Sequence, residues 1–349
     1  MPITDANDRP PTLTKPRVSC LMPAYNAERY IRAAIDSVLS QTLENFEFII
    51  VNDESTDSTA SILDEYARKD CRIQVFHEKH GGVVSALNKG LSHCSAEYVA
   101  RMDADDICAP RRFAVQVEYL DLHPNCACVG GLFMNIDEAG AHHGVFRYSR
   151  NRVTSFETFP VRVALTCHPL AMLRRSVLSS VGGYRSTFPH AEDYDLFLRI
   201  AEHGTVDNPD ELLLYYRTHS KSVSWRNVEV QEAEAAYAEL DALLMHRGQP
   251  NPAGASADYE AARREIDRFF PKWLTEPYIR FRVWRRLVNL DPEWASRLKG
   301  KVLLSALSLD LKTLFSRDYW GLRIRMLGRL LLTEVERGKA TLQNVRARR

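Results

Sequence analysis

Three carboxylates stand within four residues at Asp103-Ala104-Asp105-Asp106, shortly after an apolar segment that ends at Arg101. Negative charges this close together are costly unless a cation neutralises them. Carboxylate oxygens are the ligands that Mg²⁺ and Mn²⁺ prefer, and such ions often bind together with substrate phosphates. The tetrapeptide therefore predicts a divalent metal site. Read alone, it also fits a solvated acidic turn that caps the next helix.

Two further polar clusters follow apolar segments in the same way. They are residues 23–26 (Pro-Ala-Tyr-Asn) and residues 52–57 (Asn-Asp-Glu-Ser-Thr-Asp). Tyr25 could stack on a nucleobase, and the carboxylate of Asp53 could accept hydrogen bonds from a base or a ribose. Taken singly, each cluster also fits an ordinary turn.

The elements that position these clusters are predicted from hydrophobic periodicity. Runs of β-forming residues at 18–22, 46–51, 73–76 and 97–101 alternate with helical spacing at 30–39, 58–68 and 83–92. Such alternation predicts parallel strands joined by helical crossovers. Ligands of such sheets bind beyond the carboxyl ends of the strands, so the three clusters are expected to gather at one edge.

The later part of the chain is predicted in less detail. We expect a helix at 111–121, a strand at 126–131, less regular structure at 132–165, a strand at 168–173, and helices at 175–181 and 194–202. Beyond about residue 224 the pattern is helical, at 228–247, 257–269 and 300–332.

Five segments, taken together, resemble family 2 glycosyltransferases of the GT-A fold. They are residues 18–26, 37–42, 51–57, 86–91 and 103–106, whose order and spacing follow that family through residues 17–224. The resemblance implies an α/β fold of the Rossmann-like, nucleotide-diphospho-sugar transferase type, with a mixed sheet flanked by helices. Beyond the matched part, the helical pattern predicts an α-helical C-terminal extension.

The resemblance implies a role for each matching residue. Those implied in binding the sugar donor are Pro23, Tyr25, Asp53, Asn88 and Asp103. Asp103 and Asp105 would hold Mn²⁺ or Mg²⁺, with His219 of the Tyr-Arg-Thr-His stretch (216–219) as a further ligand or a diphosphate contact. In the Glu192-Asp193 pair, Asp193 matches the general base. One departure is Asn52-Asp53-Glu54, where many members have Asp-Asp-Gly. This departure bears on which nucleobase the donor site prefers.

The adjacency of Glu192 and Asp193 also favours a general base here. Neighbouring carboxylates raise each other's pKa, which suits a base that works near neutral pH. The same pair would also suit a helix N-terminus for electrostatic reasons. His219 could equally be a structural histidine.

The function implied is inverting transfer from a nucleoside diphosphate sugar, UDP-sugars being favoured, to a hydroxyl acceptor. The acceptor would be a saccharide or lipid-linked saccharide in bacterial surface-polysaccharide or glycolipid synthesis. Two alternatives stay open. A nucleotidyltransferase would need a Gly-rich basic loop at residues 23–26. A catalytically inactive protein, serving for nucleotide-sugar binding or as a scaffold, would not need Asp105 and Asp193. No G-x-G-x-x-G or P-loop pattern predicts NAD or ATP binding.

We expect the chain to have three parts: a flexible tail at 1–16, a GT-A domain at 17–225, which the resemblance implies, and a helical region at 226–349. The net charge of +1 does not predict a nucleic-acid partner. Residues 271–349, however, hold 18 Lys/Arg against 7 Asp/Glu. Within them, 312–332 reads as a basic amphipathic helix that would lie on an anionic membrane, on a partner or on its own domain.

Cellular location is predicted from cysteine usage and hydropathy. Seven scattered cysteines without zinc-ligand spacing indicate reduced thiols. We find no signal-peptide core and no apolar run of about 18 residues. These features predict a cytoplasmic protein, with peripheral contact at the inner face of the cytoplasmic membrane if the basic helix binds lipid.

Overall fold

The computed structural model describes residues 15–148, 154–156, 161, 163–219, 228–249, 251–256 and 258–270, together with 272, 275–276, 278–279 and 282. The chain divides into two units, one of residues 1–154 and 163–266 and the other of residues 155–162 and 267–349. All helices and strands named below belong to the first unit. The predicted basic helix at 312–332 and most of the predicted tail lie outside the described residues.

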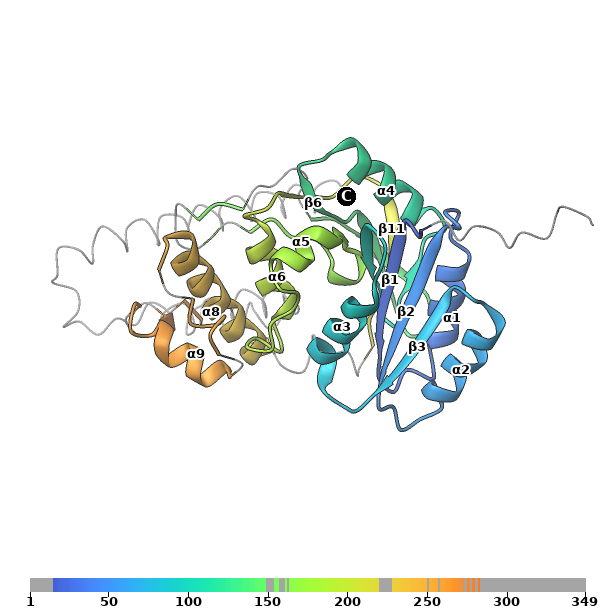
Figure 1. Ribbon diagram of the computed structural model, residues 1–349, viewed down its shortest axis with the longest axis horizontal. Helices are drawn as coiled ribbons and strands as arrows, with labels where there is room; N and C mark the ends of the chain where they lie inside the picture. Colours follow the sequence, from blue (N-terminus) through green and yellow to red (C-terminus); the bar gives the residue numbers. More distant parts are fainter. Residues whose placement is uncertain are drawn as a thin grey trace, which may run out of the picture. The chain divides into compact units, whose positions relative to one another are not determined.

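A seven-stranded sheet forms the frame of the first unit (Figure 1). Its strands are β1 (Val18–Ala24), β2 (Phe46–Asp53), β3 (Ile73–Glu78), β4 (Tyr98–Arg101), β6 (Cys126–Val129), β9 (Met172–Arg174) and β10 (Thr205–Asp207), in the order β10-β6-β9-β4-β1-β2-β3. β1 pairs in parallel with β2 and β4, whereas β9 runs antiparallel between β4 and β6. The predicted mixed sheet is confirmed, and the carboxyl ends of β1, β2 and β4 lie at one edge.

Helices cover both faces of this sheet. α1 (Ile31–Leu39), α2 (Thr59–Lys69) and α4 (Arg112–Leu122) contribute to one core, and α3 (Gly82–His93), α5 (Arg175–Ser180) and α6 (Glu192–Ile200) contribute to the other. In Figure 1, α1 and α2 lie on one side of β1–β3 and α3 on the other. Along β1, Cys20 and Met22 lie in the first core and Leu21 in the second. Because side chains alternate along a strand, a strand buried on both faces is mostly apolar, as β1 is apart from Ser19, whose buried hydroxyl bonds to Glu47.

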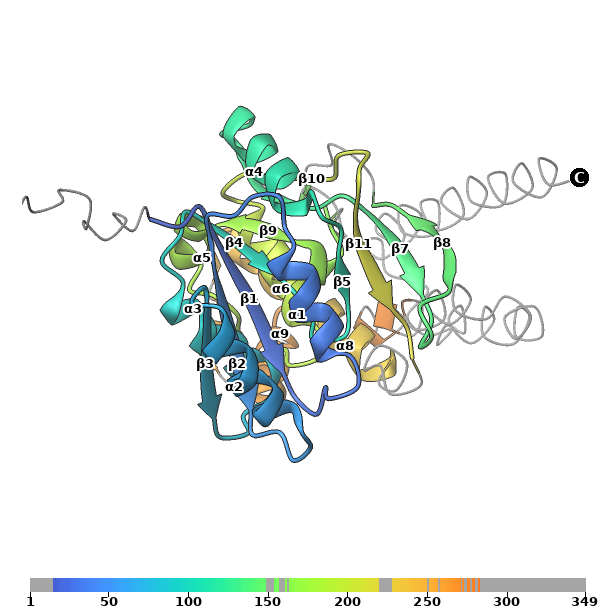
Figure 2. The same ribbon diagram turned by 90° about the vertical axis from the view of Figure 1, so that its right-hand side faces the viewer.

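A smaller sheet lies next to the turn that follows β4 (Figure 2). Its strands, in spatial order, are β5 (Ile107–Cys108), β11 (Leu212–Arg217), β7 (Leu132–Ile136) and β8 (His142–Phe146). The prediction of less regular structure was wrong for β7 and β8, which form a hairpin. Its turn is stabilised by Asp137, whose carboxylate accepts hydrogen bonds from the backbone N–H groups of Ala139 and Ala141. Gly140 supplies the positive φ that this turn requires.

Two prolines lie where the predicted strand limits differ from the structure. Pro23 remains inside β1, opposite Val51 of β2. The carbonyl of Leu21 accepts a hydrogen bond from the N–H of Met102, on the β4 side of β1. Pro23, two residues later, faces the same side, where β4 has already ended, so no hydrogen bond is lost because proline has no N–H. The predicted strand at 168–173 was wrong in its first half. His168–Leu170 forms a 3₁₀ turn that contains Pro169, and β9 begins only at Met172.

Helices α8 (Val228–His246) and α9 (Tyr259–Ile266) lie where helices were predicted. Both belong to the unit that contains the sheet. This unit ends at Ile266 and so continues past the predicted domain boundary at residue 225. Among the described residues, none of the helices combines the length and hydropathy needed to cross a bilayer.

Candidate active site

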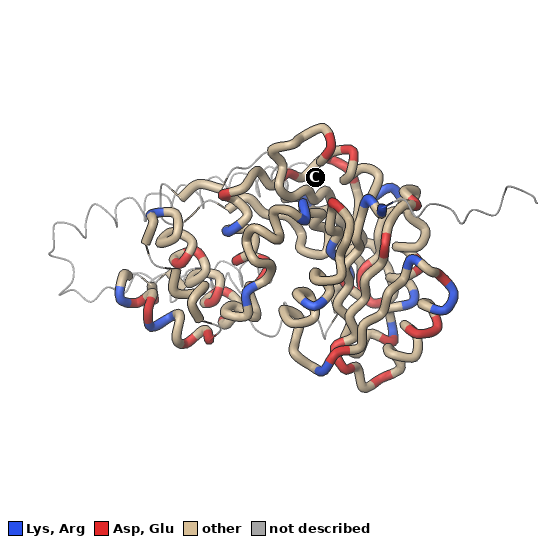
Figure 3. Tube along the Cα trace, viewed as in Figure 1, with Lys and Arg blue, Asp and Glu red and all other residues tan. Residues whose placement is uncertain are grey.

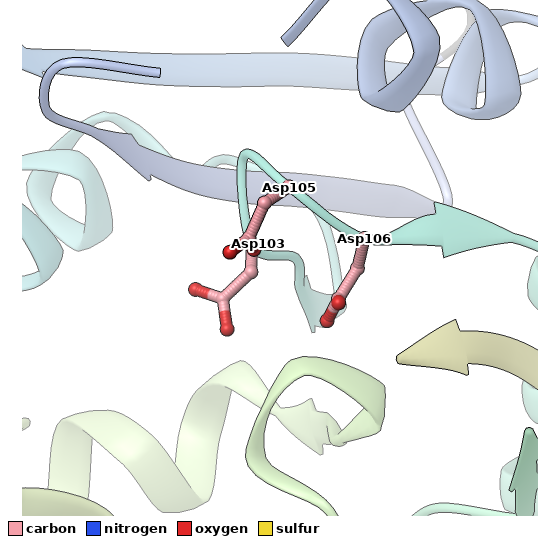
Figure 4. Close-up of side chains that lie close together, drawn as sticks. All are labelled: Asp103, Asp105 and Asp106. Carbon is pink, nitrogen blue, oxygen red and sulfur yellow. The ribbon is translucent and has the colours of Figure 1, made fainter. Parts of the chain in front are cut away.

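The turn between β4 and β5 carries Asp103, Asp105 and Asp106. Each offers one carboxylate oxygen, and these oxygens lie within 4.8 Å of one another. Figure 4 shows the three side chains projecting to the same side of the turn. Asp106 is buried; its Oδ1 accepts a hydrogen bond of 2.7 Å from the backbone N–H of Arg217, and its Oδ2 has no hydrogen-bond partner among the described atoms. An unsatisfied buried carboxylate oxygen is costly, and a cation would satisfy it.

β11 brings Arg217 and His219 to this turn. The Nε of Arg217 donates to the carbonyl of Asp105 at 2.9 Å, and its Nη1 donates to the carbonyl of Asp137 at 2.9 Å. Arg217 thereby fixes the backbone that carries the acids. His219 Nε2 lies 2.9 Å from Asp105 Oδ2. Two residues implied as metal ligands by the resemblance are thus neighbours in space.

Arg101 is a buried cation that the sequence analysis did not single out. Its Nη1 lies 2.5 Å from Asp103 Oδ2, and its side chain is 6% exposed. Its charge also acts on Asp106 and Glu192. An arginine at the end of an otherwise apolar strand was a signal available from the sequence, because such a charge is rarely buried unless it is paired.

The pKa values of two turn carboxylates reflect this crowding. Burial, followed by the charge of Asp103, raises the pKa of Asp105. Burial, followed by the charge of Asp105, raises the pKa of Asp106 well above its ordinary range. His219 and Arg101 act in the opposite direction on Asp105. The cluster is therefore short of positive charge, as expected of a site for a cation.

The second acid group stands at the start of α6. This helix begins at Glu192, two residues before its predicted start, so Glu192 and Asp193 both lie in the first turn. Burial, followed by the charge of Asp193, raises the pKa of Glu192 from 4.5 to about 8. Asp193 Oδ1 accepts a hydrogen bond of 2.7 Å from the backbone N–H of Tyr194. At neutral pH, Glu192 therefore keeps its proton in most molecules.

A neutral buried pair lies behind Glu192. His168 Nε2 is 2.9 Å from the hydroxyl of Tyr184, and His168 Nδ1 is 3.9 Å from Glu192 Oε1. Burial, followed by the charge of Arg101, lowers the pKa of His168 well below its usual range. Burial raises the pKa of Tyr184. Neither group adds charge near neutral pH, so Glu192 lacks a strong counter-ion on this side.

The residues predicted to bind the nucleoside lie at the ends of β1 and β2. Tyr25 follows Pro23 and Ala24 of β1, is 49% exposed, and packs against His80 with 4.6 Å between ring centroids. Asp53 is buried, and its two oxygens accept the backbone N–H groups of Gly81 at 2.8 Å and Gly82 at 3.0 Å. His80 Nδ1 lies 2.9 Å from Asp53 Oδ2. Asp53 thus orders the loop before α3 and retains limited capacity to accept another hydrogen bond.

Asn88 makes a different kind of contact from the one expected. Its Oδ1 accepts the backbone N–H of Tyr184 at 2.9 Å, and its Nδ2 donates to the carbonyl of Tyr184 at 2.8 Å. Gly183 precedes this clamp with a φ of +70°, and a Cβ there would lie 2.7 Å from Asn88 Oδ1. Because both ends of its amide are occupied, Asn88 joins α3 to the segment before α6.

Known proteins are similar in sequence to this chain. Residues 19–182 match the family model "Glycosyl transferase family 2". EpsE of Bacillus subtilis (strain 168) is 36% identical over 284 residues, which cover 79% of this chain and 97% of EpsE. The O-antigen biosynthesis glycosyltransferase WbnJ of Escherichia coli is 33% identical over 210 residues, covering 59% of this chain and 81% of WbnJ.

Among solved structures, S. aureus TarS 1–349 in complex with UDP-GlcNAc aligns with a TM-score of 0.52 and 18% identity. The alignment covers 84% of this chain and 87% of TarS 1–349. At this identity the likeness shows the fold alone, and the predicted GT-A fold is thereby confirmed. With two relatives above 30% identity matched over most of their length, the chain belongs to glycosyl transferase family 2.

Proposed function

We propose that this glycosyltransferase takes a sugar from a nucleoside diphosphate, with UDP-sugars as first candidates, and passes it with inversion to a hydroxyl group. The observation that supports this is the arrangement of two acid groups around one buried cation. The Asp103–Asp106 turn and the Glu192–Asp193 pair both interact with Arg101. One group has the chemistry of a cation site and the other that of a proton acceptor.

The turn has the donor set that a divalent ion requires. Its three carboxylates are close together, one buried oxygen lacks a partner, and His219 stands beside Asp105. Mn²⁺ or Mg²⁺ would be held by Asp103 and Asp105 with His219, and such an ion supplies positive charge for a departing diphosphate. Arg217 and Arg101 keep these ligands in place through the turn backbone and through Asp103.

Asp193 is the proposed general base. Inverting transfer needs one carboxylate that removes the proton of the acceptor hydroxyl as this attacks the anomeric carbon. Glu192 is protonated in most molecules near neutral pH, and a protonated acid cannot take up this proton. Glu192 therefore keeps the pair from carrying two negative charges, while Asp193 accepts the proton.

The donor's nucleoside is proposed to lie over Tyr25 and near Asp53, with Pro23 shaping the end of β1. Tyr25 is half exposed and available for stacking. Asn88 would act indirectly, since its amide holds Tyr184.

The biological setting proposed is synthesis of a surface polysaccharide or glycolipid, on a saccharide or lipid-linked saccharide acceptor, at the cytoplasmic side of the membrane. It is motivated by the relative WbnJ, which carries the name of an O-antigen biosynthesis enzyme.

The first experiment is calorimetric titration of UDP, GDP and dTDP, each with and without Mn²⁺. The protein is compared with Asp105→Ala and with Glu118→Ala, a matched control because Glu118 is an exposed acid on α4. Binding of one nucleotide that requires Mn²⁺, is lost in Asp105→Ala and is kept in Glu118→Ala supports the donor site. Absence of binding to folded protein under all conditions would refute it and favour a scaffold protein that does not bind nucleotides.

Inversion is tested separately. Proton NMR of the transfer product should show an anomeric configuration opposite to that of the donor sugar. Retention of the donor configuration would contradict the assignment of Asp193 as the base of a single displacement.

A further inference from the structure

Helix α8 buries acidic side chains, which is unusual for a helix outside the sheet core. Glu234, Glu239 and Asp241 are 2%, 1% and 0% exposed. Figure 3 marks acidic positions along this helix, which Figure 1 labels. Burying a carboxylate costs free energy unless a partner compensates for the lost water, so the partners of these acids indicate what the helix does.

All three acids have partners in the segment that carries the catalytic pair. Glu234 accepts from the backbone N–H of His190 at 2.7 Å and lies 2.8 Å from its Nδ1. Glu239 accepts a short hydrogen bond from the hydroxyl of Tyr194. Asp241 Oδ2 lies 3.0 Å from Arg185 Nη1.

Further contacts extend this connection on both sides. The guanidinium of Arg185 also bonds to Asp195, a fully buried residue of α6. The hydroxyl of Thr187 donates to the carbonyl of Ala253 at 2.9 Å, and Ala253 in turn donates its N–H to Asp241 Oδ1 at 3.0 Å. The segment from Arg185 to Asp195 is thus bound to the chain beyond residue 228 at several points.

These contacts bracket the proposed base. His190 precedes Glu192 by two residues, Tyr194 follows Asp193 directly, and Asp195 comes next. We infer that α8 is a positioning element for the catalytic acid pair, with Glu234, Glu239 and Asp241 setting where Asp193 stands relative to the donor. This inference rests on the proposed function, because it takes Asp193 as the base.

The donor side of the site has a different support. Tyr25, Asp53 and Asp103 stand at the ends of β1, β2 and β4, which are held by the sheet. Loss of an α8 contact should therefore displace the base and leave nucleotide binding intact. A displacement of about 1 Å can lower a rate about 100-fold. The effect expected is a fall in kcat without a change in nucleotide Kd.

The test uses the full chain and the contact between Tyr194 and Glu239. Tyr194→Phe removes one hydroxyl, Glu239→Gln removes one charge, and the double variant removes both. Glu229→Gln, an exposed acid of the same helix, is the matched control. Nucleotide Kd is measured by calorimetry with UDP, GDP or dTDP and Mn²⁺. Turnover is measured as release of nucleoside diphosphate from UDP-, GDP- and dTDP-hexoses with water as acceptor.

We expect each single variant to lower kcat about 10- to 100-fold, with Kd within about twofold and the control unchanged. The double variant should lose little more than either single variant, because both substitutions act on the same contact. Unchanged kcat in Tyr194→Phe, or equal losses in kcat and binding, would overturn the inference. Tyr194→Phe decides the matter if Glu239→Gln fails to fold.

Failure of the proposed function would look different. The unmodified protein would then bind no nucleotide and release none, whatever residue is changed on α8. Hydrogen exchange of residues 185–195 provides a further readout, since faster exchange in Glu239→Gln than in Glu229→Gln is expected if the contact holds this segment.

Discussion

Replacement of Glu192 by glutamine should make the protein more stable at high pH, whereas most point mutations destabilise a protein. Burial and the charge of Asp193 raise the pKa of Glu192 from 4.5 to about 8. Arg101 acts against this rise, and the nearby His168 is neutral. Glutamine resembles the protonated acid in shape and hydrogen bonding, but it cannot ionise.

The sign follows from proton binding. Between pH 4.5 and about 8 the folded protein holds a proton on Glu192 that the unfolded chain has released. Stability then falls as pH rises, by about 1.4 kcal/mol for each pH unit. The contribution of Glu192 to the free energy of unfolding is therefore largest below pH 4.5, and its loss is complete above the folded-state pKa. From pH 5 to pH 8 the free energy of unfolding of the native protein should fall, relative to Glu192→Gln, by about 3 kcal/mol.

Urea denaturation at pH 5 and pH 8, without metal or nucleotide, measures this difference. Glu118→Gln is the control, because the same substitution at an exposed site should leave the pH dependence unchanged. Equal pH dependence in Glu192→Gln and the native protein would refute the reasoning. At pH 7, where about nine-tenths of Glu192 is protonated at a pKa of about 8, the variant should also keep its turnover within about threefold.

Three further predictions concern other parts of the site. Asp193→Asn should lower kcat about 10²- to 10⁴-fold while leaving the calorimetric Kd for nucleotide unchanged; parallel loss of both would contradict its role as base. Arg101→Met leaves Asp103 without its buried counter-ion and should cost about 3 kcal/mol in urea denaturation with EDTA, part of which Mn²⁺ restores; no effect of Mn²⁺ would argue against a cation site here. Asn88→Ala breaks both hydrogen bonds to Tyr184 and should cost about 2 kcal/mol by the same measurement, with nucleotide Kd unchanged; a large rise in Kd would instead indicate direct donor contact.

Much of the fold could be predicted because its signals are local. Helical periodicity indicates the helix at 31–39, and an apolar run indicates the strand at 46–53. The hairpin of β7 and β8 was missed because its side chains are mostly half-exposed or exposed, so its hydrophobic alternation is weak. The start of α6 was placed two residues late because acids are common both in turns and in first helical turns.

The residues with chemistry could be identified from the sequence, as could the edge of the sheet at which most of them lie, since parallel strands bring Tyr25, Asp53 and Asp103 to one side. The contacts of each residue, in contrast, follow only from the folded chain. His219 is 114 residues from Asp105 in the sequence and contacts it in the structure, and Arg101 lies buried between two acid groups. Protonation, burial and hydrogen bonding depend on neighbours that are distant in the chain, and no local pattern of residues specifies them.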